Sequence, residues 1–324
     1  MKKIATVLPF FVMAFASAQS YPPQAGTAGS TAIFKDSEQF VGWATGIEVV
    51  RGLLQKSNPE LAINGNNRAS AGSPENAVGF PDGNTVSLGD EGSATLTFAS
   101  PIYDGEGFDF AVFENGGVTY LELAFVEASS DGVHFFRFPA HSETQTETQI
   151  GAFGTPSAPY LNNLAGKYSA LYGTPFDIGE LPNDVNLNKD NITQIRIIDV
   201  VGTIDPLFAT FDSFGNAVND SYPTPFASCG FDLQAVGVIH QQQLNLKANG
   251  KTFLKIFPNP ASDFLYVNTS ETIGIRITDA SGRLILEQQI KNGKAVDTSQ
   301  LISGLYHVQL LLNGKISTQK LIVR

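Results

Sequence analysis

Cysteine and histidine are both scarce in this chain. Cys229 is the only cysteine in 324 residues, and there are four histidines. A single thiol cannot form an internal disulfide, so the fold must be held by core burial, by a bound metal or by both. We expect Cys229 to be a buried, inert thiol. The sequence also lacks Gly-x-Ser-x-Gly, His-Glu-x-x-His, Cys-x-x-Cys and P-loop motifs, so the common sequence signatures of catalysis are missing.

Basic residues are few in most of the chain. Residues 19–244 hold 26 acids and 8 bases, whereas residues 245–324 hold 5 acids and 10 bases. Two regions of opposite charge indicate two domains with different roles. The acidic region repels nucleic acid and anionic membranes, and it suits cations, neutral ligands or basic partners.

The one long apolar run lies at the N-terminus. Met1–Lys3 is basic, Ile4–Phe15 is apolar, and Ala16-Ser17-Ala18 is a small-x-small cleavage site. This order predicts a cleaved export signal over residues 1–18. The run is shorter than the roughly 20 residues of a membrane-spanning helix, so we do not expect an integral membrane protein.

The remaining pattern is that of an all-β protein. Phenylalanine is abundant, glycine and proline mark many turns, and helical periodicity is rare. Alternating apolar runs predict strands at residues 85–88, 93–98, 108–114, 120–128, 134–138, 192–201 and 231–239. The short connections between 85 and 138 predict an antiparallel meander. Residues 139–191 read as long loops, and Ser281-Gly282 and Asn313-Gly314 predict hairpins in the basic region.

The last quarter of the chain carries several blocks of one known pattern. These are Phe257-Pro-Asn-Pro-Ala261, Ile277-Thr-Asp-Ala-Ser-Gly-Arg-Leu284, Leu301-Ile-Ser-Gly-Leu-Tyr306 and Lys320-Leu-Ile-Val-Arg324. In this order they resemble the C-terminal sorting domain of type IX (Por) secretion substrates in Bacteroidota. The resemblance implies the type IX machinery as a partner, passage through the outer membrane, and release or attachment at the cell surface. An ordinary fibronectin-like spacer is the alternative. The residues assigned to the sorting signal are Pro258, Asn259, Pro260, Gly282, Gly304 and Lys320.

The acidic region resembles, less specifically, a group of bacterial cell-surface proteins. The shared pieces include Phe80-Pro-Asp-Gly83, Asp109-Phe-Ala-Val-Phe-Glu-Asn115, Asn163-Leu-Ala-Gly-Lys-Tyr168, Gly173-Thr-Pro-Phe-Asp177 and Gly230-Phe-Asp-Leu233. That group is similar to discoidin or galactose-binding-like jelly rolls. The resemblance implies a fold and a location, not a chemistry.

Together these features predict four segments. They are a signal peptide at 1–18, an acidic jelly-roll-like β-sandwich at 19–240, a polar linker at 241–252, and a small Ig-like β-sandwich sorting domain at 253–324.

Calcium is the cofactor that the acidic loops favour. Ca²⁺ takes six to eight oxygen ligands, and an export domain without disulfides gains from a metal cross-link. Two loops offer suitable oxygens, and neither has EF-hand spacing. The predicted ligands are Asp104, Glu106 and Asp109 in the first loop and Asp212, Asn216 and Asp220 in the second. Solvated acidic loops are the alternative.

A second group of acids lies on or at the ends of the predicted strands. It comprises Glu114, Glu122, Glu127, Asp199 and Asp232. Alternation places several of them on apolar faces, where a bare carboxylate is costly and needs a cationic, backbone or metal partner. Capping of loops by strand-end carboxylates is the favoured interpretation, with a functional role as the alternative.

Aromatic and amide side chains indicate a glycan-type ligand surface. Sugar faces stack on aromatic rings, and long sandwich loops commonly carry ligands. The candidate residues are Trp43, Tyr160, Asn163, Tyr168 and Tyr172, although a packing role is favoured for Trp43.

We therefore expect an exported cell-surface or secreted protein that binds a ligand without catalysis and is supported by calcium. One alternative is a carbohydrate-active hydrolase, because such an enzyme needs only two suitably spaced carboxylates. Another is a surface accessory protein for nutrient capture beside an outer-membrane transporter.

Overall fold

A computed structural model describes residues 20–242, 254–267, 269, 271–291, 294–312 and 315–324. These residues form two compact units that divide between residues 243 and 244, and we call them the body and the tail. The predicted signal peptide and residues 243–252 of the predicted linker lie outside the described residues.

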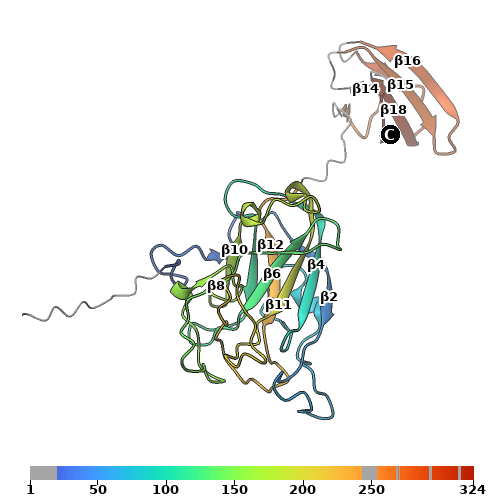
Figure 1. The fold of residues 1–324 in the computed structure, drawn as a ribbon. Helices are drawn as coiled ribbons and strands as arrows, with labels where there is room; N and C mark the ends of the chain where they lie inside the picture. The colour runs from blue at the N-terminus through green and yellow to red at the C-terminus, as the bar shows by residue number, and fades with distance from the viewer. Residues whose placement is uncertain (1–19, 243–253, 268, 270, 292–293, 313–314) are drawn as a thin grey trace, which may run out of the picture. The chain divides into compact units, whose positions relative to one another are not determined.

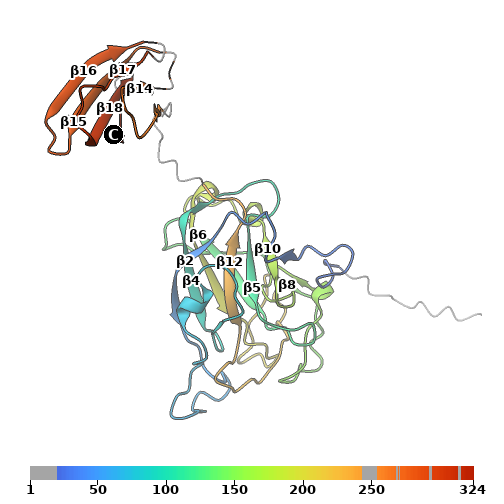
Figure 2. The same ribbon diagram turned by 180° about the vertical axis from the view of Figure 1, so that it is seen from behind.

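The body is built from one antiparallel sheet that curls into two facing halves (Figures 1 and 2). The first half has the order β1 (Ile33–Phe34), β10 (Tyr172–Phe176), β5 (Phe110–Glu114) and β12 (Asp232–Val238), with β3 (Val86–Ser87) also on β12. The second half has the order β2 (Gly42–Val50), β4 (Ser93–Ile102), β11 (Ile192–Asp199), β6 (Ala124–Ser129) and β7 (Phe136–Arg137). β2 joins the halves, because its first two residues pair with β12 and the rest pair with β4.

The main core lies between these halves. Strand alternation turns Leu96 of β4 and Ile195 and Ile197 of β11 inward, where they meet Phe110 and Val112 of β5. All five residues are buried. The apolar strands predicted from the sequence thus form a β-sandwich, and the predicted all-β class is confirmed.

Strand β5 is buried on both faces. Phe110 and Val112 enter the main core, while Ala111 and Phe113 belong to a second cluster with Trp43. A strand covered on both sides reads as a continuous apolar run. The run Phe-Ala-Val-Phe therefore reflects a central position in the sheet.

The predicted meander is wrong except for its last hairpin, in which β6 pairs with β7. Consecutive strands β4, β5 and β6 do not pair with one another: β4 pairs with β2 and β11, β5 with β10 and β12, and β6 with β11 and β7. The chain crosses between the two halves after β4 and again after β5. Local turn signals cannot reveal this, because a short loop can cross a sandwich as readily as it can close a hairpin.

The predicted long loops at 139–191 contain three strands that the sequence pattern missed. β8 (His141–Ser142) and β9 (Leu161–Asn162) form a small ribbon, and β10 completes the first half of the sheet. β10 contains Pro175, which argues against a strand in a sequence reading. The 3₁₀ turns η1 (Pro74–Ala77), η2 (Ala158–Tyr160), η3 (Ile178–Glu180) and η4 (Lys189–Asn191) complete the described body.

The tail is a separate small sandwich. A three-stranded sheet has the order β13 (Ile256–Phe257), β14 (Phe264–Val267) and β17 (Val296–Asp297). A four-stranded sheet has the order β16 (Leu284–Ile290), β15 (Ile273–Asp279), β18 (Gly304–Leu312) and β19 (Lys315–Val323). The predicted turn at Ser281-Gly282 joins β15 to β16, with Gly282 at φ 85°. The predicted turn at Asn313-Gly314 lies outside the described residues.

Candidate metal and ligand sites

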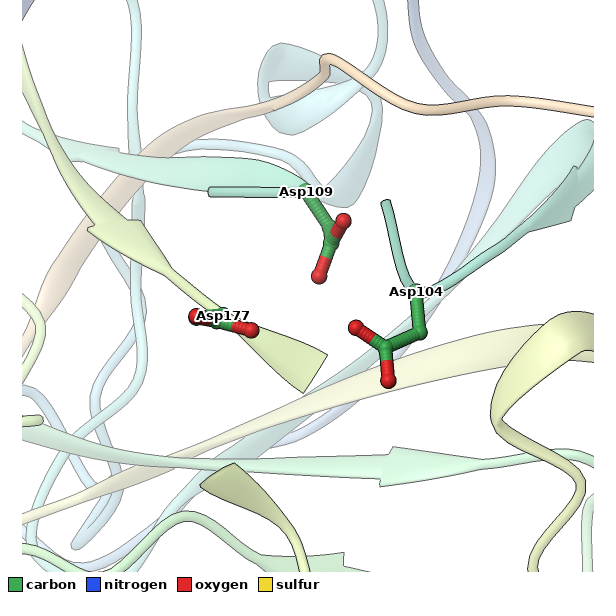
Figure 3. Close-up of side chains that lie close together, drawn as sticks. All are labelled: Asp104, Asp109 and Asp177. Carbon is green, nitrogen blue, oxygen red and sulfur yellow. The ribbon is translucent and has the colours of Figure 1, made fainter. Parts of the chain in front are cut away.

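Three aspartates from separate segments converge in the body. Asp104 follows β4, Asp109 directly precedes β5, and Asp177 directly follows β10. One carboxylate oxygen of each lies within 4.8 Å of the others, and Figure 3 shows the three carboxyl groups close together around a common space. The pairing of Phe110 with Phe176 brings Asp177 beside Asp109. We call this group the aspartate triad.

Asp109 is the fixed member of the aspartate triad. Its side chain is fully buried. Oδ1 accepts the backbone N–H of Gly105 at 2.8 Å and lies 2.7 Å from His240 Nδ1, and Oδ2 accepts the N–H of Ile178 at 2.7 Å. Burial raises the pKa of Asp109, and these three bonds oppose the rise. Oδ1 thus accepts two bonds, whereas Oδ2 accepts one and keeps a lone pair that a cation can use.

Asp104 and Asp177 are half-buried, so the aspartate triad is open to solvent. Asp177 Oδ1 accepts the N–H of Gly179 at 2.8 Å and caps η3. Within the described part of the chain, no lysine or arginine forms an ion pair with any of the three carboxylates. Three oxygen donors with this deficit of positive charge suit a hard cation such as Ca²⁺.

The structure brings together two of the three residues predicted in the first metal loop. Asp104 and Asp109 are in the aspartate triad, whereas Glu106 is exposed and is not a member. Asp177 was missed, because only the pairing of β10 with β5 makes it a neighbour. Its position at the end of the Gly173-Thr-Pro-Phe-Asp177 block was the available signal.

The predicted second metal loop does not gather around one point. Asp212 accepts the backbone N–H of Asn216 at 2.8 Å and its amide at 3.1 Å, together with the N–H of Ser142 at 2.9 Å. Burial raises the pKa of Asp212, but these hydrogen bonds lower it by more, so the pKa lies below its ordinary value. Asp220 instead lies beside the start of β6, where it accepts the N–H groups of Leu123 and Ser221, both at 2.7 Å. Asp212 and Asn216 therefore stabilise a turn.

The predicted ligand-binding aromatics are scattered. Trp43 packs in an aromatic cluster at centroid distances of 5.0 to 5.6 Å from Phe40, Phe80 and Phe113. Tyr172 packs on Phe34 at 5.4 Å. Tyr160 lines a groove of about 480 Å³. The five candidates do not form one surface, because their segments enter different parts of the sandwich.

Asn163 and Tyr168 do share a cavity. It has a volume of about 140 Å³, and its wall includes Lys167, Thr174 and Glu180. Asn163 and Tyr168 reach it from the segment that follows β9, and Thr174 reaches it from β10. We call this the lysine pocket.

The lysine pocket has an unusual polar lining. Lys167 is 4% exposed, donates to the carbonyl of Leu161 at 2.6 Å and lies 5.2 Å from the ring centroid of Tyr168. Burial lowers the pKa of Lys167 to about 8. Thr174 Oγ1 is buried and has no hydrogen-bond partner. Buried polar groups of this kind are normally paired, so they indicate a site for a polar ligand or water.

Four of the five strand-end acids meet at one end of the body. Leu233 of β12 pairs with Glu114 of β5, and Asp199 of β11 pairs with Ala124 of β6, so these strand ends lie together. Asp199 accepts the N–H of Phe231 at 2.7 Å. The four are Glu114, Glu122, Asp199 and Asp232.

Glu127 stands apart from the other strand-end acids. It accepts Nε of Arg137 at 3.0 Å and Nε of Arg196 at 2.8 Å. The guanidinium groups also lie over the rings of Phe125 and Phe135. This carboxylate has the cationic partners that a buried acid needs.

The proposed sorting residues take structural positions in the tail. Asn259 clips the proline-rich segment to the last strand: its Nδ2 donates to the carbonyl of Lys320 at 2.8 Å, and its Oδ1 accepts the N–H of Ile322 at 3.0 Å. Pro258 and Pro260 flank this clip, each after a cis peptide bond. Gly282 lies in the turn after β15, and Gly304 begins β18. The clip brings four of the six residues together, and the two glycines lie in other segments.

Comparison with known proteins identifies the tail. Residues 255–324 match the family described as a secretion system C-terminal sorting domain. No curated protein matches the chain. The sorting domain implies interaction with the type IX secretion machinery and indicates a protein exported to the cell surface or secreted. In the described residues, no helix is both long and apolar enough to cross a membrane.

Several glycosidase structures are distantly similar. A β-glucuronidase from Ruminococcus gnavus in complex with uronic isofagomine is 11% identical, with a TM-score of 0.19 over 82% of this chain and 37% of that chain. A β-glucuronidase from Lactobacillus rhamnosus is 11% identical, with a TM-score of 0.19 over 87% and 45%. A glycoside hydrolase domain of Endo-D from Streptococcus pneumoniae R6 is 11% identical, with a TM-score of 0.19 over 86% and 37%. The chain spans less than half the length of these proteins. Such TM-scores carry no argument about activity, and the likeness to discoidin-like jelly rolls stays a prediction.

Proposed function

We propose that the body is a non-catalytic binding module, supported by calcium, which the type IX machinery delivers to the cell surface or the medium. The aspartate triad is the observation that carries the calcium part of this proposal. Its three carboxylates come from two distant parts of the chain and meet within 4.8 Å. An ion here would tie the turn after β4 to the end of β10, in a domain with no disulfide.

The chemistry of the aspartate triad favours Ca²⁺ over other metals. All three donors are carboxylate oxygens, and His240 is already engaged with Asp109. Mg²⁺ demands a near-ideal octahedron, whereas Ca²⁺ accepts irregular sets of carboxylates, carbonyls and water. Asp104, Asp109 and Asp177 would supply the charge, and backbone carbonyls and water would supply the remaining ligands.

Thermal unfolding tests the calcium role. We expect the wild-type protein to melt several degrees higher in calcium than in EDTA, because a ligand at 100 times its Kd stabilises by about 2.7 kcal/mol. The Asp177→Asn protein should lose most of this calcium-dependent rise in melting temperature, because the aspartate triad loses one of its charges. Asp184→Asn, at an exposed acid, is the matched control and should behave like wild type. Equal melting temperatures with and without calcium in the wild type would contradict the proposal.

We assign ligand binding to the lysine pocket. A volume of about 140 Å³ limits the ligand to one small unit, such as a terminal sugar of a glycan. The ammonium of Lys167 donates one hydrogen bond to the protein, and the hydroxyl of Thr174 makes none, so both groups can hydrogen-bond a ligand. Tyr168 offers a ring beside them.

A glycan array with the isolated body tests the ligand. We expect a restricted set of glycans to bind, and Asn163→Ala and Lys167→Met to reduce that binding at least tenfold. Tyr160→Phe, outside the lysine pocket, should have no effect. Binding that is unchanged in both pocket variants, or no bound glycan at all, would count against this assignment.

The hydrolase alternative has less support from the geometry. Glu114 is 1% exposed, and Glu127 is 6% exposed and bound by two arginines. Neither carboxylate can approach a glycosidic bond as a glycosidase acid or nucleophile must. Turnover of a glycan that the body binds would contradict the non-catalytic proposal.

A further inference from the structure

The lysine pocket holds a buried cation that has no acidic partner. Lys167 is 4% exposed, and its ammonium donates one hydrogen bond, to the carbonyl of Leu161. Within the described body, no carboxylate forms an ion pair with this ammonium. Burial lowers the pKa of Lys167 to about 8, so the ammonium is still mostly protonated at pH 7. A buried charge is costly unless it is paired, so the pocket favours a ligand that brings a negative charge.

Thr174 supplies a second unsatisfied group in the wall of the lysine pocket. It is 3% exposed, and its Oγ1 has no hydrogen-bond partner among the described residues. The pairing of Thr174 with Val112 of β5 fixes its position in the sheet. An ammonium has three N–H groups, of which Lys167 uses one, and a hydroxyl can donate one hydrogen bond. These two donors of one small pocket match the two oxygens of a carboxylate.

The charge of the lysine pocket favours a carboxylate over a phosphate. Lys167 is the only base among the residues that line the pocket, and Glu180 is the only acid. One ammonium balances a group with a single negative charge. A phosphate group carries about −1.5 to −2 at pH 7, so part of its charge would stay unbalanced in the pocket. The lining therefore points to a ligand with one carboxylate.

The exposed part of the lysine pocket suits the hydroxyl groups of a sugar. Phe108 and Glu180 are exposed, whereas Lys167 and Thr174 are buried, so the cation lies deep in the pocket and the acid lies at its rim. The amide of Asn163 donates to Glu180 Oε2. The carboxylate of Glu180 can also accept hydrogen bonds from ligand hydroxyls, and because it is exposed, water screens its repulsion of an anion.

We propose that the lysine pocket recognises a terminal sugar that carries a carboxylate, such as a uronic acid. The carboxylate pairs with the ammonium of Lys167 and accepts the hydroxyl of Thr174, and the sugar hydroxyls meet Asn163 and Glu180 at the rim. This inference rests on the ligand-binding function proposed above for the same pocket, and it adds the chemical class of the ligand.

Titration of the full mature chain with acidic sugars and their neutral counterparts tests the ligand class. The probes are the methyl glycosides of galacturonic and glucuronic acid, the carboxamide of each, and the methyl glycosides of galactose and glucose. By calorimetry at pH 7, we expect at least one acid to bind about tenfold more tightly than its carboxamide, because the amide cannot form a charge pair. Neutral sugars that bind as well as the acids, with binding lost in Asn163→Ala, would refute the acidic ligand and keep the proposed binding function. If no sugar of either kind binds, both are refuted.

Two variants test the donors. Lys167→Met removes the charge, so the affinity for the acid should fall to that for its carboxamide. Lys35→Met is the matched control, because Lys35 also donates to a carbonyl, that of Pro81, but does not line the pocket, and it should keep the preference for the acid. Thr174→Val keeps the shape of the side chain and should weaken binding of the acid severalfold, which provides a test even if Lys167→Met does not fold. Tryptophan fluorescence checks the folding of each variant. A preference for the acid that persists in folded Lys167→Met, or an unchanged affinity in Thr174→Val, would overturn the inference.

Discussion

Glu127 and Glu114 show how one residue type takes two roles within a single sheet. Both glutamates are almost fully buried. Glu127 faces two arginines, so its charge is matched inside the protein. Glu114 faces other acids and keeps one oxygen without a partner. The neighbours differ, so a glutamate in a strand forms salt bridges in one case and stays an unpaired buried acid in the other.

Two glycines with the same positive φ distinguish the cost of backbone strain from the cost of a steric clash with a neighbouring atom. Gly166 and Gly107 have φ of 83° and 84°. An added carbon at Gly107 would meet no neighbour, whereas at Gly166 it would overlap the carbonyl of Glu122. We expect Gly107→Ala to lower the free energy of unfolding by about 1 kcal/mol and Gly166→Ala by about 3 kcal/mol or more, measured by urea unfolding. Equal losses would mean that the contact at Gly166 does not matter.

At the scale of elements, the strands of the body collect acids at their ends. β5, β6, β11 and β12 end or begin beside the strand-end acids, and antiparallel pairing fixes which ends meet. The inward faces of these strands are apolar, so each acid is placed where the core gives way to loops. Asp90 and Asp199 extend the same acidic end. Burial raises the pKa of both, and repulsion from Asp90 adds to the rise at Asp199, as repulsion from Glu91 does at Asp90.

These buried acids predict how stability depends on pH without calcium. Burial raises the pKa of Asp220 and of Asp90 to about 7, from an ordinary value of 3.8. At Asp90, repulsion from Glu91 adds to the rise, whereas the charge of Lys56 and the hydrogen bond from its backbone N–H lower the pKa. Between about pH 4 and pH 7 the folded protein keeps protons that the unfolded chain has released, so the free energy of unfolding falls as pH rises. This stabilising contribution is fully present below that window and is lost above it.

Urea unfolding in EDTA at about pH 5 and about pH 7.5 measures this dependence. We expect the metal-free protein to be less stable at the higher pH, by a few kcal/mol. A free energy of unfolding that rises with pH in EDTA would contradict the assignment of these acids as protonated in the folded protein.

At the scale of the whole molecule, the chain is an acidic body followed by a basic tail. The division between residues 243 and 244 separates two sandwiches with their own cores. The tail matches a sorting domain, which implies a role in delivery, so the proposed ligand binding is assigned to the body. Two units with separate cores should each fold without help from the other.

Calorimetry tests this independence. We expect two unfolding transitions in the full mature chain, and one of them alone in a fragment that ends at residue 243, at an unchanged temperature. Calcium should shift only the transition of the body, because the aspartate triad lies there. A single transition that moves when the tail is removed would mean that the two units depend on each other.

Three features of this protein can be predicted from the sequence alone: the all-β class, the opposite charges of the two regions and the export tail. Each of these follows from local pattern: alternation sets a strand, composition sets charge, and ordered motifs at residues 257–324 mark the sorting domain. The sequence also identified Asp104 and Asp109 as a candidate site and the strand-end acids as a group in need of partners. These residues lie near one another in sequence or share a position relative to strand ends.

The pairing of strands, and with it the contacts between distant side chains, is visible only in the folded structure. Asp177 joins Asp109 because β10 pairs with β5, and the predicted meander fails because the chain crosses between sheets. Glu127 leaves the acidic group because β11 and β7 bring Arg196 and Arg137 to it. Strand pairing is set by the burial of whole faces between distant segments, and no local run of residues records which distant strand will cover it.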